Sequence, residues 1–213
     1  LLGPHRSRGG VPTGKFFLEA FAGCGRQTGA IAGLGMRVAA TLDIGGDVSV
    51  DLSRRSVVDE VVAWIDGGLL WGIWLAMPCT FDSVASQHVR RSAADLTRRE
   101  RLVANALRLL ARALAAGLVA VVENPRGSRL WHRRRLRRIQ RRWSLIEVDH
   151  DMCPFGTCFR KPQRLLTNRA ELARVSRFCD CKVDCHEHLT GKAEVWIDGR
   201  WQWRWKTALA SAY

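Results

Sequence analysis

The segment Lys15–Gly35, KFFLEAFAGCGRQTGAIAGLG, joins an apolar run to a glycine-rich turn and a stretch compatible with a short helix. The run Lys15–Phe21 predicts a buried strand, because most of its positions are apolar rather than alternating. Gly23 and Gly25 allow the backbone to turn tightly and to approach a ligand closely. The helix that follows offers N–H groups and the positive end of its dipole to an anion. The segment therefore predicts a strand–turn–helix unit with a ligand site at the turn.

The rest of the chain continues this alternation of strands and helices. Apolar spacing predicts helices over residues 56–68 and 93–116, and strands over residues 37–43, 71–76, 118–125, 144–149 and 164–168. Several of these strands are apolar throughout, which is typical of a parallel sheet covered on both faces. The last connections are too short for helices, so we expect the final strands to pair antiparallel. The pattern predicts an α/β fold.

The composition bounds the organisation and the partner. The 213 residues suit one domain with a small appendage, and an apolar content of 47% is ample for a buried core. The net charge of +14 favours a polyanionic partner, with nucleic acid first and an anionic membrane surface second. We find neither a signal peptide nor an apolar run that could span a bilayer, and we expect an intracellular protein, nuclear in a eukaryote. Residues 1–14 are predicted to form a flexible basic arm.

Chemically useful residues follow the predicted strands. Asp43 ends the second strand and is placed to accept hydrogen bonds from ribose hydroxyls. Pro78 stops the third strand, because it cannot donate a ladder hydrogen bond, and this places Cys79 at the strand's carboxyl end. Glu123 ends the next apolar strand, where a carboxyl in a dry cleft can act as an acid. Ligands bind at this edge of open α/β sheets, so these residues predict one shared site.

Each of these features also has a purely structural explanation. The glycine turn can serve packing alone, Cys79 can be a small core residue, and Glu123 can cap nearby backbone N–H groups. Taken alone, the core explanation of Cys79 is the better one. Their common placement at one sheet edge favours a functional site.

In this order, the glycine turn, the acid, the Pro-Cys pair and the Glu-Asn pair resemble the C5-cytosine DNA methyltransferases. FLEAFAGCG is similar to their first motif, PCTFDS to their Pro-Cys motif, and FRKPQRLLTN faintly to an arginine-bearing strand. The resemblance covers residues 15–168 and implies a class I, Rossmann-like catalytic domain that binds S-adenosylmethionine. The implied cofactor-binding residues are Phe21, Ala22, Gly23, Gly25, Asp43, Ile44, Asp51, Leu52 and Pro78. The implied catalytic residues are Cys79, Glu123 and Arg164.

The resemblance implies methyl transfer to C5 of cytosine through a covalent Cys79 adduct. C5 is a poor nucleophile until a thiolate adds to C6, and the ring accepts the thiolate only if N3 is protonated or hydrogen-bonded, which is the role implied for Glu123. Arg164 is implied to steady Glu123 and the base. The target base must flip out of a duplex or be single-stranded. Two alternatives stay open: a catalytically silent nucleic-acid-binding module of a larger polyprotein, and methylation of RNA rather than DNA.

The C-terminal segment, residues 169–213, contains a dense Cys/His cluster. Three thiols and two imidazoles lie within CDCKVDCHEH, and an odd cysteine count with interleaved histidines favours a metal over disulfides. The candidate ligands of a structural zinc are Cys179, Cys181, Cys185, His186 and His188. Either four of these bind, or three bind together with Cys153 or Cys158. Beyond the cluster, the Asp198-Gly199 pair predicts a hairpin over residues 193–205, and residues 206–213 a helical stub.

A strongly basic segment follows Glu123 directly. RGSRLWHRRRLRRIQRRW holds nine arginines among eighteen residues, and we expect it to be part helical and to border the cleft. Arginines there suit phosphate contacts with DNA or RNA. The predicted contacts are Arg126, Arg129, Arg133, Arg134 and Arg137. We expect Trp131 and Trp143 to anchor the segment to the core.

Overall fold

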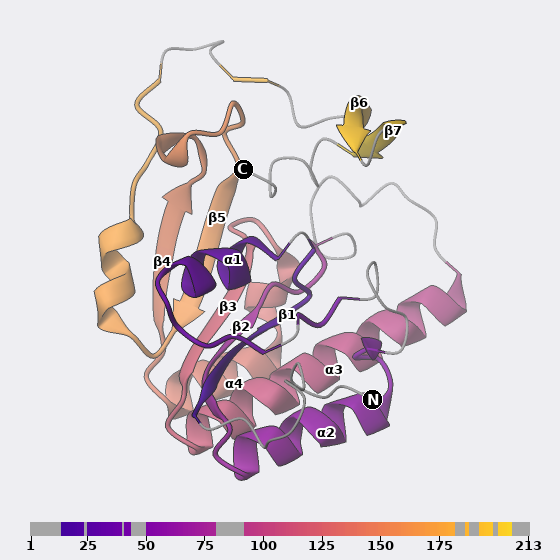
Figure 1. Ribbon diagram of the computed structural model, residues 1–213, viewed down its shortest axis with the longest axis vertical. Helices are drawn as coiled ribbons and strands as arrows, with labels where there is room; N and C mark the ends of the chain where they lie inside the picture. Colours follow the sequence, from indigo (N-terminus) through magenta and orange to yellow (C-terminus); the bar gives the residue numbers. More distant parts are fainter. Residues whose placement is uncertain are drawn as a thin grey trace.

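The computed structural model is built on one five-stranded sheet with a separate two-stranded hairpin (Figure 1). It describes residues 14–23, 25–39, 41–43, 50–79, 92–181, 186–187, 192–197 and 200–205. The strands of the large sheet are β1 (Phe16–Ala20), β2 (Leu70–Leu75), β3 (Val119–Pro125), β4 (Ile146–Asp151) and β5 (Pro162–Thr167). Their order is β1-β2-β3-β5-β4. The first three strands pair in parallel, and β5 pairs antiparallel with both β3 and β4. The predictions of an α/β fold and of antiparallel pairing among the last strands are confirmed.

Helices cover the two faces of the sheet unequally. The described residues form four α-helices: α1 (Arg26–Gly33), α2 (Arg55–Asp66), α3 (Ala93–Ala115) and α4 (Arg134–Arg142). Apolar residues of α2, α3 and α4 pack with apolar residues of β1, β2 and β3 in the main core. The other face has a smaller apolar cluster around Val121, Val148 and Leu165, which the 3-10 helix η6 (Ala170–Val175) helps to cover. The helix α1 packs against β1.

The long helix α3 has strong end signals in the sequence. Ser92 accepts a hydrogen bond from the Asp95 backbone, and the Asp95 carboxylate accepts one in return, so that a capping box begins the helix. Gly117, with φ +72°, ends it in the left-handed conformation that glycine adopts without strain. The expected helices over 56–68 and 93–116 are therefore confirmed within two residues. No helix in the described part of the chain is long and apolar enough to cross a bilayer.

Two expected features differ in detail. The expected strand over 37–43 is reduced to two isolated parallel bridges to β1, from Val38 to Phe17 and from Leu42 to Ala20. The hairpin is confirmed as β6 (Lys192–Ile197) paired antiparallel with β7 (Arg200–Trp205). The basic arm up to residue 13 and the expected stub over 206–213 lie outside the described residues.

Candidate functional site

The glycine turn after β1 holds three residues in left-handed backbone conformations. Phe21 has φ +62°, Gly23 has φ +56° and Gly25 has φ +68°. Phe21 N donates to Leu42 O at 2.7 Å, and Gly23 N donates to Asp43 Oδ2 at 2.9 Å. A left-handed phenylalanine is strained, and such strain gathers at ligand sites and turns. The turn and Asp43 therefore lie together, as the sequence predicts.

Glu19 is a buried acid on β1, just before this turn, and the sequence analysis did not identify it. It is 1% exposed on β1, and its Oε2 accepts from both Thr28 N and Thr28 Oγ1 at 2.7 Å. Burial raises the pKa of Glu19, the two Thr28 hydrogen bonds oppose this, and the Asp43 charge adds to the rise. The signal in the sequence was a lone acid inside an apolar strand, because such an acid needs a partner once buried. Glu19 ties β1 to the first turn of α1.

The Pro-Cys turn leaves the end of β2 and is held by the neighbouring strand. Asn124, 3% exposed on β3, donates from Nδ2 to Met77 O at 2.6 Å. Met77 is buried, Pro78 is exposed, and Cys79 is a partly buried free thiol. The hydrogen bond fixes the backbone just before Cys79. Asn124 therefore positions the turn that carries the candidate nucleophile.

Glu123 lies on the α1 face of the sheet, one residue from Asn124. Trp74 Nε1 donates to Glu123 Oε2 at 3.0 Å. Burial raises the pKa of Glu123, while the charge of Lys161 and the Trp74 hydrogen bond counteract the rise and the charge of Glu19 adds to it. A carboxyl with a raised pKa holds its proton to higher pH and can donate it. Glu123 is thus suited to act as an acid.

Lys161 is a buried cation at the same edge and was also missed. It is 7% exposed and immediately precedes β5. Burial lowers the pKa of Lys161, and the charges of Cys79 and Glu123 oppose that change. With the Gln163 amide turned to satisfy its surroundings, Gln163 Oε1 accepts from Lys161 Nζ at 3.2 Å. The signal available in the sequence was its place shortly before the strand expected over residues 164–168.

Two expected cofactor contacts need correction. Asp51 Oδ2 accepts from Arg98 Nη2 at 3.0 Å and its Oδ1 accepts from Ser53 N at 2.8 Å. Burial alone would raise the pKa of Asp51, but these hydrogen bonds hold it below its ordinary value. Leu52 is 2% exposed inside the main core, and its carbonyl accepts from Asn105 Nδ2 at 2.8 Å. These two residues anchor the start of α2 to α3, and Ile44 lies outside the described residues.

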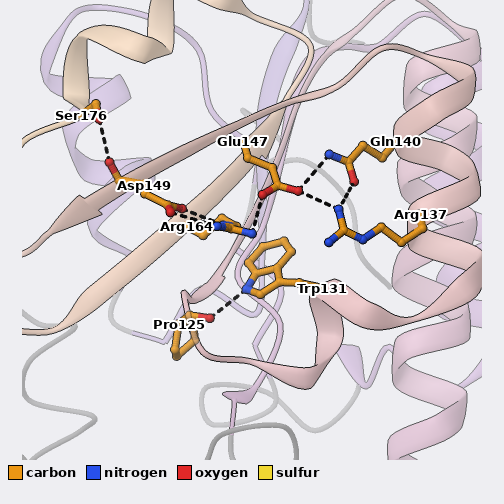
Figure 2. A network of polar contacts seen from close by, with 8 residues as sticks. All are labelled: Pro125, Trp131, Arg137, Gln140, Glu147, Asp149, Arg164 and Ser176. Atoms are coloured by element: carbon orange, nitrogen blue, oxygen red, sulfur yellow. Dashed lines mark hydrogen bonds and ion pairs between the residues drawn. The ribbon is translucent and has the colours of Figure 1, made fainter.

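The expectation that Arg164 steadies Glu123 is wrong in this geometry. Arg164 donates to Asp149 through Nε at 2.6 Å and through Nη2 at 2.9 Å, and its Nη1 is paired with Glu147 (Figure 2). In the antiparallel register, Arg164 lies opposite Asn124 and Leu165 lies opposite Glu123. Paired residues share a face, so Arg164 and Glu123 leave the sheet on opposite sides.

The basic segment packs on the face of the sheet opposite Glu123. Trp131 is buried, donates from Nε1 to Pro125 O at 2.8 Å, and anchors the segment as expected (Figure 2). Trp143 packs against the main core. Arg133 donates to both Glu100 oxygens at 2.7 and 3.0 Å. Arg137 donates to Glu147 at 2.8 Å and to Gln140 at 2.9 Å.

The predicted phosphate contacts therefore divide into two groups. Arg133 and Arg137 each pair with a carboxylate of the same chain, Glu100 and Glu147, and as phosphate contacts they stay predictions. Arg129 and Arg134 are exposed, and Arg126 is partly buried near Asp149.

A continuous basic surface lies on the outside of α4. Leu136 and Ile139 face the core. At 3.6 residues per turn the opposite side presents five exposed arginines, which we call the α4 outer face. It comprises Arg134, Arg135, Arg138, Arg141 and Arg142. Within the described residues, no carboxylate forms an ion pair with any of them.

The Cys/His cluster forms a compact group of possible metal ligands. Cys153, Cys179, Cys181 and His186 each offer one ligand atom, and these atoms lie within 4.8 Å of one another. Cys179 Sγ lies 3.4 Å from His186 Nε2. Burial raises the pKa of the Cys153 thiol to about 12, and the neighbouring Cys179 and Cys181 add to the rise. The group can hold a metal ion, with Cys153 joining three of the expected ligands; Cys185 and His188 lie outside the described residues.

Comparison with known proteins adds no assignment to these sites. The chain matches no protein-family model and no curated protein sequence.

Proposed function

We propose that the chain transfers a methyl group from S-adenosylmethionine to C5 of cytosine in DNA, through a covalent adduct of Cys79. One observation carries the proposal: the 2.6 Å hydrogen bond from Asn124 to Met77 O joins the Pro-Cys turn to the strand of Glu123. A thiol and a carboxyl of raised pKa thus follow neighbouring parallel strands at their carboxyl ends. This pairing of a nucleophile with an acid is what addition to a cytosine ring requires.

The protein's own groups supply the activation of the base. The Cys79 thiolate adds to C6, and the Glu123 carboxyl gives its proton to N3, so that C5 becomes nucleophilic. Asn124 holds the Cys79 turn, and Trp74 orients the Glu123 carboxyl. After methylation a base removes the C5 proton, the thiolate leaves C6, and N3 returns its proton. The bound cofactor supplies the methyl group.

The glycine turn fits the cofactor better than the later residues do. A Cβ added at Gly23 would meet nothing within 4 Å, so open space lies beside the turn where a ligand can approach the backbone. Asp43 adjoins this space through its hydrogen bond from Gly23 N. We propose that these two residues, with Phe21, Ala22 and Gly25, hold the cofactor. Asp51 and Leu52 are not included, since both are engaged elsewhere.

The α4 outer face supports DNA as the partner. Five exposed arginines without paired acids among the described residues complement the phosphate backbone, which carries the sequence-independent part of binding. Its position on the side away from Glu123 suits a contact that anchors the polymer rather than the target base. Binding there is expected to be strongly salt-dependent.

We further propose that the metal of the Cys/His group is zinc. Three thiols and one imidazole are a donor set typical of structural zinc sites, in which all four positions are filled by the protein. No acid or base partner motif accompanies the group in the sequence, and this favours a structural role over a catalytic one.

The decisive test combines methyl-labelled cofactor with DNA and RNA oligonucleotides and looks for label in 5-methylcytosine. We expect label in DNA, and a denaturation-resistant adduct with DNA that contains 5-fluorocytosine, because fluorine blocks the final elimination. Cys79→Ser should abolish both, since a serine alkoxide is far harder to form, and Glu123→Gln should suppress the adduct strongly. Label in RNA alone would identify RNA, and not DNA, as the substrate. Full activity of Cys79→Ser would overturn the mechanism.

A second candidate is a silent methyltransferase-like module that binds nucleic acid. The ion pair of Asp51 favours it, because a residue that the resemblance assigns to the cofactor is already bound to Arg98. This candidate predicts DNA binding with neither label nor adduct in the wild-type protein. The same assay therefore separates the two functions.

A further inference from the structure

Two segments of chain, far apart in the sequence, meet at the Cys/His group. Cys153 begins the 3-10 helix η5 (Cys153–Phe155), directly after β4. Cys179, Cys181 and His186 come from the segment that follows η6. Their ligand atoms lie within 4.8 Å of one another, as expected for groups that share one tetrahedral ion at bond lengths of about 2.0–2.3 Å.

Hydrogen bonds already align the later segment with the end of β4. Asp151 N donates to Arg177 O at 2.8 Å, and Asp151 Oδ2 accepts from Cys179 N at 2.9 Å. Glu187 N donates to Cys158 O at 2.9 Å. These hydrogen bonds bring the ligands together, while Cys181 and Glu187 and the described residues 176–178 and 180 are exposed. A segment with so little apolar burial needs another source of stability.

The same connection carries Lys161. Met152, the residue before Cys153, donates from its backbone N to Lys161 O at 3.2 Å. Asp151 and Pro162 are paired in the register of β4 and β5. Lys161 O is thus bonded to the residue before Cys153, and the following Pro162 is paired with Asp151, whose carboxylate accepts from Cys179 N.

We infer that Cys153, Cys179, Cys181 and His186 coordinate one zinc ion, and that this ion fastens the segment after η6 to the β4–β5 connection that positions Lys161. Cys153 is the ligand that makes the site a clamp, because it alone comes from the sheet side of the connection. Each thiol that coordinates the ion binds as a thiolate, and its proton is released to solvent. The inference rests on the proposed zinc and on no step of methyl transfer.

The chain offers a matched control for Cys153. Cys158 belongs to the same connection and is exposed, but it is not in the Cys/His group. We expect full-length protein purified without chelator to contain about one zinc and no iron per chain. Cys158→Ser should keep that content, whereas Cys153→Ser should weaken zinc affinity by more than about 100-fold, beyond what loss of an outer-shell partner costs. Retention of wild-type affinity by Cys153→Ser would overturn this ligand set, and iron in place of zinc would overturn the identity of the ion.

The clamp itself is tested on the wild-type protein, so that no variant has to fold. Chelation followed by amide hydrogen exchange should raise the exchange rates at Met152 and Cys179 and leave Val122, in the centre of β3, unchanged. Unchanged exchange at Met152 after complete zinc removal would show that the ion does not hold this connection. Loss of zinc binding and loss of methyl transfer are read separately, by metal analysis and by label, so either proposal can fail without the other.

Discussion

Arg164 and Glu123 lie on opposite faces of the sheet, although their strands are neighbours. The register pairs Arg164 with Asn124, and the guanidinium points toward Asp149 and Glu147 (Figure 2). The Glu123 carboxyl instead accepts a hydrogen bond from Trp74. The arginine therefore holds β5 to β4 and takes no part at the Cys79 edge. Its loss should therefore lower the free energy of unfolding and leave adduct formation unchanged.

Arg164→Lys tests this separation. A lysine ammonium cannot form the paired hydrogen bonds that the guanidinium makes to Asp149, so we expect the free energy of unfolding to fall by about 1–3 kcal/mol. Denaturant titration measures the loss. The yield of the 5-fluorocytosine adduct per folded molecule should stay at the wild-type level. A folded Arg164→Lys protein that forms no adduct would show that Arg164 is needed for the chemistry.

The Arg164–Asp149 ion pair makes the free energy of unfolding depend on pH. The hydrogen bonds from Arg164 hold the pKa of Asp149 below its ordinary value, so its contribution is present above the unfolded pKa, about 3.9, and is lost as the pH falls through the lower folded pKa. We expect Asp149→Asn to unfold with about 2 kcal/mol less free energy than wild type at pH 7. The difference should shrink below pH 4. A difference that is constant from pH 7 to pH 3, measured by urea unfolding, would contradict this.

Gly23 and Gly117 form a matched pair for the cofactor site. Both have left-handed φ, +56° and +72°, and neither would bring an added Cβ within 4 Å of another atom. Alanine should therefore cost roughly 1–2 kcal/mol at either position through backbone strain. Only Gly23→Ala should weaken S-adenosylmethionine binding in a calorimetric titration, because Gly117 lies at the end of α3, where β3 begins. Equal affinities of the two variants would remove the turn from the cofactor site.

The α4 outer face is tested by the salt dependence of DNA binding. Each phosphate contact contributes about 0.9 to the slope of log affinity against log salt on duplex DNA. Replacing Arg134, Arg138 and Arg141 with alanine should flatten the slope by about 2.7 if all three touch phosphates. Arg108→Ala with Arg112→Ala is the control, because Asp59 and Asp66 already pair with those side chains. An equal effect of the control would mean that only net charge matters.

The sheet could be predicted because local sequence patterns are enough to identify its strands. The apolar runs of β1, β2 and β3 and the glycine ends of the helices need no knowledge of distant residues. The segment over 37–43 was expected as a full strand and makes only two bridges to β1. Strand length depends on partners that a local pattern does not contain.

The site was less predictable for the same reason. The sequence predicts that Cys79 and Glu123 lie near strand ends, but the role of Asn124 appears only once β2 and β3 are known to be neighbours. The side of the sheet that Arg164 faces depends on strand register, which a one-residue shift reverses. The burial of Lys161 and the choice of Cys153 over Cys158 depend on how the β4–β5 connection folds back.

The place of β5 has a consequence for biosynthesis. β5 lies between β3 and β4 but follows both in the chain, so β3 keeps a bare edge while α4 and β4 are being synthesised. A bare strand edge invites pairing with other chains. Nascent chains that stall before Pro162 therefore expose the edge of β3 to edge-to-edge aggregation. The sheet can close only after Thr167, the last residue of β5, has emerged from the ribosome.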